Sequence, residues 1–119
     1  SVVEIEVKVD SAVIGDAADF KTMREYQSFA FLLNPSKGIF IFNSLGRHIR
    51  TIDIPHIKSF NFLGEEMYYL RGATLEFFNL FSAETRLMSI DREYTDALLT
   101  DERIILFTPA RIDIFAFRP

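Results

Sequence analysis

The chain has 119 residues and a net charge of −4; 49% of the residues are apolar and 14% are aromatic. This length suffices for one domain with a buried core, and the composition differs strongly from that of a disordered chain. The acidic balance argues against nucleic acid as a main partner. No cysteine is present, so a disulfide framework and a thiolate metal site are both excluded. No apolar run approaches the ~20 residues of a membrane helix, and we expect no membrane insertion.

The first predicted element is a strand at residues 2–9, VVEIEVKV. One face carries Val3, Ile5, Val7 and Val9, and the other carries Glu4, Glu6 and Lys8. This alternation is typical of a half-buried strand, and the charged face suits a sheet edge that must avoid stray pairing. Residues 10–19 are small and polar and indicate a connection. A short helix over residues 16–26, with Asp16 as N-cap, is an alternative for the next segment.

Residues 38–54, GIFIFNSLGRHIRTIDI, predict a β-hairpin. A β-branched and aromatic run at 39–42 is followed by turn-forming residues at 43–46 and by a second apolar strand ending at Ile54. Because an isolated hairpin is marginal in water, it needs neighbouring strands.

The same pattern recurs along the chain at intervals of about 37 residues. The second strands of the three repeats have, at equivalent positions, Leu33, Leu70 and Phe107 in turn. The third strands are IFIFN at 39–43, LEFFN at 75–79 and IDIFA at 112–116. Short apolar stretches at 60–63 and 97–99 precede the second and third copies, whereas the counterpart in the first copy, near residues 20–24, is less clear. Each repeat therefore predicts four short antiparallel strands.

This repeated four-strand pattern favours an all-β chain of about three propeller-blade repeats over an ordinary sandwich or barrel with accidental spacing. We expect a single domain over residues 1–119, with repeats at about 20–55, 56–91 and 92–119 and residues 2–9 as an extra, exchangeable strand. The third repeat reaches Pro119 without an outer strand. Since propellers have four to eight blades, three would form an open arc. We expect it to be completed by a second copy with strand exchange, or by the remainder of a longer protein.

The hairpin resembles the NHL-type repeat, in which an apolar run ending in Phe and Asn precedes a Gly turn: here Phe42 and Asn43, then Gly46. Residues 20–119 are similar to the C-terminal blades of secreted six-bladed propeller-like proteins of Bacteroidetes, through the NPSKGIFIFN block, the YYL strand and the final IDIF strand. The second repeat departs from this pattern with Ser82-Ala83-Glu84 in place of the Gly turn. The resemblance implies an exported, periplasmic or extracellular protein and brings no catalytic residues.

Two sets of polar residues are candidate sites. His48, Asp53 and His56 could bind a transition metal, but Pro55 interrupts the strand, and a solvent-facing strand explains both histidines as well. Glu76 and Asp113 occupy matching positions in two third strands and could form a carboxylate pair for sugar hydrolysis, although ordinary exposed strand positions explain them too.

The function that the sequence favours is a non-catalytic binding or assembly module, with self-association and a protein or carbohydrate ligand as its partners. We assign no catalytic residue and expect no cofactor. The alternative is a propeller-type carbohydrate-active hydrolase or lyase, so enzymatic activity stays open, with a binding role preferred.

Overall fold

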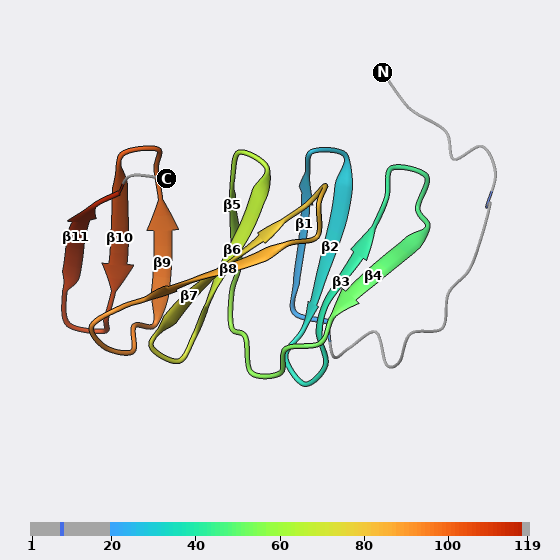
Figure 1. The fold of residues 1–119 in the computed structure, drawn as a ribbon. Helices are drawn as coiled ribbons and strands as arrows, with labels where there is room; N and C mark the ends of the chain where they lie inside the picture. The colour runs from blue at the N-terminus through green and yellow to red at the C-terminus, as the bar shows by residue number, and fades with distance from the viewer. Residues whose placement is uncertain (1–7, 9–19, 118–119) are drawn as a thin grey trace, which may run out of the picture. The chain divides into compact units, whose positions relative to one another are not determined.

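The computed structural model describes Lys8 and residues 20–117, and every regular element in this part of the chain is a β-strand (Figure 1). The strands are β1 (Thr22–Tyr26), β2 (Phe29–Asn34), β3 (Gly38–Phe42), β4 (His48–Ile52), β5 (Asn61–Leu63), β6 (Glu66–Arg71), β7 (Thr74–Asn79), β8 (Thr85–Ser89), β9 (Asp96–Leu99), β10 (Arg103–Phe107) and β11 (Ile112–Ala116). None of the described residues belongs to a helix that could cross a membrane.

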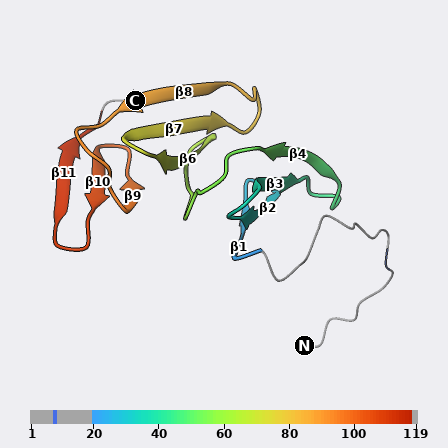
Figure 2. The ribbon, with the colours of Figure 1, turned by 90° about the horizontal axis from the view of Figure 1, so that it is seen from below.

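The strands form three antiparallel sheets in which chain neighbours pair with one another. Their orders are β1-β2-β3-β4, β5-β6-β7-β8 and β9-β10-β11. The prediction of an all-β chain with blade-like repeats is confirmed, and within the described residues the third sheet has three strands. In both views β11 lies at the edge of its sheet (Figures 1 and 2).

The first strand of the first sheet shows which secondary structure the segment before residue 26 adopts. The predicted helix alternative over residues 16–26 is wrong for its described C-terminal half, because Thr22–Tyr26 is β1 and pairs with β2. Residues 16–19, like the predicted strand at 2–9, lie outside the described residues. Met23, which the helix alternative places on one side together with Phe20, instead has Leu32 as its cross-strand partner.

The pairing register explains the repeat that is visible in the sequence. The residues that recur at intervals of about 37 in the second strands are the cross-strand partners of those that recur in the third strands. These pairs are Leu33–Ile39, Leu70–Leu75 and Phe107–Ile112. Because neighbouring side chains on one face of a sheet pack on each other, the recurring pairs keep the same apolar face in each blade.

An asparagine at the end of the third strand builds the turn to the fourth strand. Asn43 Oδ1 accepts two backbone N–H groups of the β3–β4 turn, each at 3.0 Å, and Asn79 Oδ1 accepts two in the β7–β8 turn, each at 2.9 Å. Such asparagine-to-backbone bonds are typical of turn starts. Ala116 stands at the matching position of the third repeat and has no side-chain acceptor.

The departure of the second repeat from the Gly turn has a conformational reason. Gly46 has a φ of 80° in the β3–β4 turn, and Ala83 has a φ of 62° in the β7–β8 turn. Both residues are in the left-handed region, which glycine adopts freely and alanine adopts at a cost of about 1–2 kcal/mol. The second repeat therefore keeps the left-handed turn without its glycine.

The chain divides into two compact units, Ser1–Asp53 with the first sheet and Ile54–Pro119 with the second and third. The single domain predicted over the whole chain stays a prediction. In the second unit, side chains of both sheets form one apolar core. Its buried members are Tyr68, Leu75, Phe77, Tyr94, Ala97, Leu99, Ile104, Leu106 and Phe117.

Two contacts fix the third sheet against the second. The buried backbone N–H of Leu99 donates to the phenol oxygen of Tyr68 at 2.8 Å. The rings of Phe77 and Phe117 lie parallel, with centroids 6.2 Å apart. Within the second sheet, the guanidinium of Arg86 on β8 lies 4.2 Å from the centroid of the Phe77 ring on β7. Aromatic and cation–π contacts of this kind add to the energy of burial.

The Tyr68–Leu99 bond predicts a measurable loss on removal of one hydroxyl. Tyr68→Phe leaves the buried N–H of Leu99 without its acceptor, so we expect the free energy of unfolding to fall by about 1–3 kcal/mol. Urea unfolding followed by circular dichroism measures this change. An unchanged unfolding midpoint would show that water or another group replaces the phenol.

Candidate functional site

The exposed edge of the third sheet is the first candidate surface. β11 pairs with β10 on one side, and no described strand pairs with its other side. Ile112 is 58% exposed and Ile114 is 65% exposed, whereas the matching residues of the second sheet, Leu75 and Phe77, are 0% and 1% exposed. Two positions that are buried in the core of the second sheet are therefore exposed to solvent in the third sheet.

An apolar cavity of about 230 Å³ lies beside this edge. It is lined by Met88 and Ile90 at the end of the second sheet and by Leu106 and Phe115 of the third. All four residues belong to the second compact unit. The cavity lies on the face of β11 that is turned toward the second sheet, where alternate side chains of an added strand would project.

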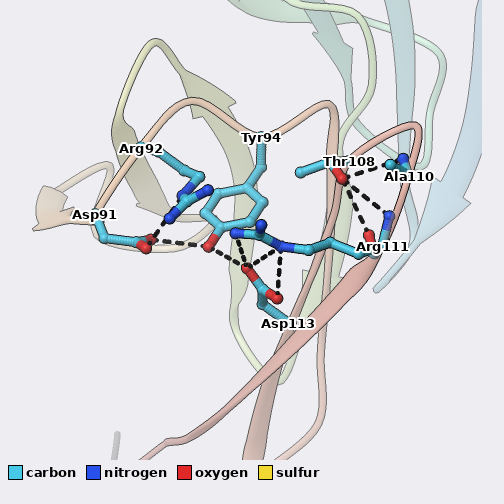
Figure 3. A network of polar contacts seen from close by, with 7 residues as sticks. All are labelled: Asp91, Arg92, Tyr94, Thr108, Ala110, Arg111 and Asp113. Carbon is cyan, nitrogen blue, oxygen red and sulfur yellow. Dashed lines mark hydrogen bonds and ion pairs between the residues drawn. The ribbon is translucent and has the colours of Figure 1, made fainter.

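Asp113, one of the two predicted acidic residues, belongs to a polar network on β11 (Figure 3). Tyr94 has one phenolic proton, yet its oxygen lies 2.8 Å from both Asp91 Oδ1 and Asp113 Oδ2. It can donate to one carboxylate at a time, so the other charge must be balanced by arginine. Arg111 binds Asp113 through Nε and Nη2, each with a contact of 3.0 Å, and Arg92 Nε lies 3.3 Å from Asp91.

This network shifts the pKa of its members in opposite directions. The hydrogen bonds from Arg111 and then from Tyr94 lower the pKa of Asp113, and the hydrogen bond from Tyr94 lowers the pKa of Asp91. Burial, followed by the bonds to the two carboxylates, raises the pKa of Tyr94 to about 12. At neutral pH the network therefore holds two carboxylates and a neutral phenol. That state suits a structural clamp better than a general acid, which needs a pKa near the working pH.

Glu76, the other predicted acidic residue, is 7% exposed, so the expectation of an ordinary exposed strand position is wrong. Its carboxylate is hydrogen-bonded to the phenol of Tyr69, its cross-strand neighbour, and lies 3.6 Å from Arg71 Nη1. Burial, followed by Glu76, raises the pKa of Tyr69. A carboxylate can be buried here because a donor and a cation accompany it.

Glu76 and Asp113 thus share more than their place in the repeat. Each carboxylate is bound by a tyrosine and an arginine, namely Tyr69 with Arg71 and Tyr94 with Arg111. Sequence spacing predicts the matching positions of the two acids but not these partners, since Tyr69 comes from the neighbouring strand and Tyr94 from the segment before β9. A catalytic role for the pair stays a prediction.

The three candidate metal ligands are divided between the two compact units, although they lie within nine residues of sequence. His48 is on β4, where Nε2 lies 2.8 Å from Thr51 Oγ1 and the ring lies 5.3 Å from that of Phe42. Asp53 ends the first compact unit, and His56 belongs to the second. Within the described residues, no group of three or more His, Cys, Asp or Glu side chains could hold a metal ion.

A second, more polar cavity of about 360 Å³ lies in the second compact unit. His56 lines it together with Lys58, Glu93 and Tyr94. Of these four, the sequence analysis singled out His56, as a candidate metal ligand. No feature of the sequence marked Glu93 or Tyr94 as a site residue, because neither stands in a repeated position or in a motif.

The pKa of Asp113 predicts a pH dependence of stability. A folded-state pKa below the usual value of about 3.9 contributes stability above that pH, and the contribution is lost as the pH falls through the folded-state pKa. Asp113→Asn should therefore lower the unfolding temperature at pH 6, and the difference from wild type should shrink as the pH falls below 4. Thermal unfolding from pH 6 to pH 3 measures it, with Asp101→Asn as an exposed control. A difference that grows toward low pH would contradict the clamp.

Burial of Glu76 predicts a coupling with Tyr69. Glu76→Leu should lower the free energy of unfolding by about 1–3 kcal/mol, because the buried phenol loses its acceptor, whereas Glu76→Gln keeps an acceptor and should cost less. The double variant Tyr69→Phe/Glu76→Leu removes both polar groups and should recover part of the loss. Chemical denaturation of the wild type, Glu76→Leu, Tyr69→Phe and the double variant measures the coupling. Additive losses would show that the two side chains do not act together.

Comparisons with known proteins agree with the blade geometry. No family model and no curated protein matches the sequence. Among solved structures, the chain is similar to Kluyveromyces lactis Hsv2, with a TM-score of 0.53 and 20% identity over 76% of this chain. It is also similar to the N-terminal domain of Nup159, with a TM-score of 0.62 and 12% identity over 85% of this chain. The computationally designed Ika4 protein matches with a TM-score of 0.59 and 8% identity over 82% of this chain.

Hsv2 and the Nup159 domain are β-propeller proteins. The match spans 30% of the Hsv2 chain, 28% of the Nup159 chain and 66% of the Ika4 chain. At these identities the likeness concerns the fold alone. The three sheets of this chain are therefore blades of propeller type, and the chain corresponds to part of such a propeller.

Proposed function

We propose that this chain is a non-catalytic β-propeller module for binding and assembly, and that a strand from a second copy completes its third blade. The observation that carries the proposal is that no described strand pairs with the outer side of β11, while Ile112 and Ile114, on the face turned away from the second sheet, are more than half exposed. An unpaired sheet edge is a template for another strand. An exposed apolar face is usually covered in soluble proteins, and here a blade of the second copy would cover it.

The partner strand that we propose is residues 2–9 of the second copy. Its alternating sequence offers four β-branched residues on one face and charged residues on the other, which suits a fourth strand with one face against a core. Its apolar face would lie over the cavity lined by Met88, Ile90 and Phe115. Main-chain hydrogen bonds to β11 would supply affinity, and alternate side chains would fix the register.

Two copies with three blades each would give a six-bladed ring, a size within the usual range of propellers.

The resemblance to secreted Bacteroidetes propeller-like proteins supports an exported, periplasmic or extracellular location for this ring. We place its ligand, a protein or a carbohydrate, at the turn-lined end near the central channel, by analogy of fold. The pairing of Tyr and Arg with each of Glu76 and Asp113 supports a binding role over a catalytic one.

Light scattering coupled to gel filtration tests the assembly directly. At micromolar concentration we expect a mass of about twice 13.8 kDa. Deletion of residues 2–9 and the variant Ile114→Glu should each shift the mass toward a single chain, because the first removes the added strand and the second places a charge on the apolar face that the second copy would cover. Leu45→Glu is the matched control, since Leu45 is 79% exposed in the β3–β4 turn.

Two outcomes would overturn the proposal. The first is a single-chain mass for the wild-type protein at every concentration, which would mean that β11 is covered by its own chain or by the rest of a longer protein. The second is a stable dimer that survives both the deletion and Ile114→Glu, which would place the contact elsewhere. Circular dichroism spectra of all variants establish that each remains folded.

A further inference from the structure

The polar cavity of about 360 Å³ has the composition of a ligand site rather than of a packing gap. Its charged lining comes from His56 and Lys58, which precede β5, and from Glu93, which precedes β9. Its volume is within the range of small-molecule sites, about 300–1,000 Å³. All of its lining residues belong to the second compact unit.

The charged side of this cavity consists of exposed side chains, and among the described residues none of His56, Lys58 and Glu93 has a hydrogen-bond or ion-pair partner. By contrast, the acidic side chains of the same unit at Glu66, Glu76 and Asp113 are each bound by an arginine. The cavity therefore holds a cation, an imidazole and a carboxylate that are available to a ligand.

The remaining wall is fixed in place by hydrogen bonds to residues that do not line the cavity. Tyr94 is held through its hydroxyl by Asp91 and Asp113, as Figure 3 shows, so its ring and Leu70 supply the apolar part of the lining. The hydroxyl of Thr95 donates to the carbonyl of Phe107 at 2.9 Å. A wall that is already ordered costs little entropy when a ligand binds.

The backbone at His56 adds an independent observation. Its φ of 70° is in the left-handed region, directly after Pro55. Histidine adopts this conformation more often than most residues, but at an energetic cost, and such conformations concentrate at binding and catalytic sites. In this protein the unusual backbone presents the imidazole at the cavity.

From these features we infer that the cavity binds a small zwitterion, a free amino acid with an apolar side chain. Lys58 and the imidazole N–H of His56 bind its carboxylate, Glu93 binds its ammonium group, and Leu70 with the Tyr94 ring contacts its side chain. A simple anion fits less well because Glu93 would repel it. This site shares Tyr94 with the polar network of β11, but its charged side chains take no part in the assembly proposed there.

A titration with three related probes tests the charge pattern. Isotope-labelled protein is titrated with L-leucine, with N-acetyl-L-leucine, which lacks the ammonium group, and with L-leucinamide, which lacks the carboxylate. We expect L-leucine to shift the amide resonances of residues 56–59, 70–72 and 93–95 saturably below ~10 mM. Each analogue should bind at least about tenfold more weakly, since each loses one charge-assisted hydrogen bond.

Matched variants assign the two charges. Lys58→Gln and Glu93→Gln should each weaken L-leucine binding by about tenfold or more, whereas Lys37→Gln and Glu65→Gln, at exposed turn positions, should leave it unchanged. The inference is overturned if L-leucine gives no saturable shift, or if either analogue binds as tightly as L-leucine. It is also overturned if the Lys58 and Glu93 variants bind like the wild type.

Discussion

The backbone of β11 imposes the constraint on which the rest of this structure depends. A strand has hydrogen-bonding groups on both sides, and within the described residues β11 uses only the side that faces β10. The first two sheets show how the same constraint is met, because a fourth strand follows the third through a turn that an asparagine builds. In the third repeat, Ala116 stands at the position of that asparagine. The backbone groups along this edge therefore require water or a partner, and the exposed isoleucines on the adjoining sheet face favour a partner.

The polar networks of the second unit explain why β11 is ordered before another strand pairs with it. Asp113 is anchored on β11 by Arg111 and Tyr94, and Tyr94 also contacts Asp91. Tyr94 belongs to the apolar core as well, so one side chain connects the strand, the core and the wall of the polar cavity. A β-strand edge that is ordered in this way loses little conformational freedom on pairing, which helps binding by strand addition.

Much of the fold could be predicted from the sequence, because the repeat encodes both the strands and their register. The recurring positions of Leu33, Leu70 and Phe107 proved to be partners of the recurring third-strand residues. The burial of Glu76 could not be predicted, because alternation along one strand does not show that a neighbouring tyrosine supplies a donor. The polar cavity could not be predicted either, since it joins two segments, residues 56–59 and 93–95, that no motif connects.

Hydrogen–deuterium exchange of the β11 amides tests the central claim most directly. If a strand of another copy covers this edge in solution, the outward amides of β11 should exchange as slowly as those of β7, which lies between two strands. The protection should fall on dilution, because it depends on association. Outward amides of β11 that exchange at the rate of exposed turns at high protein concentration would contradict the account.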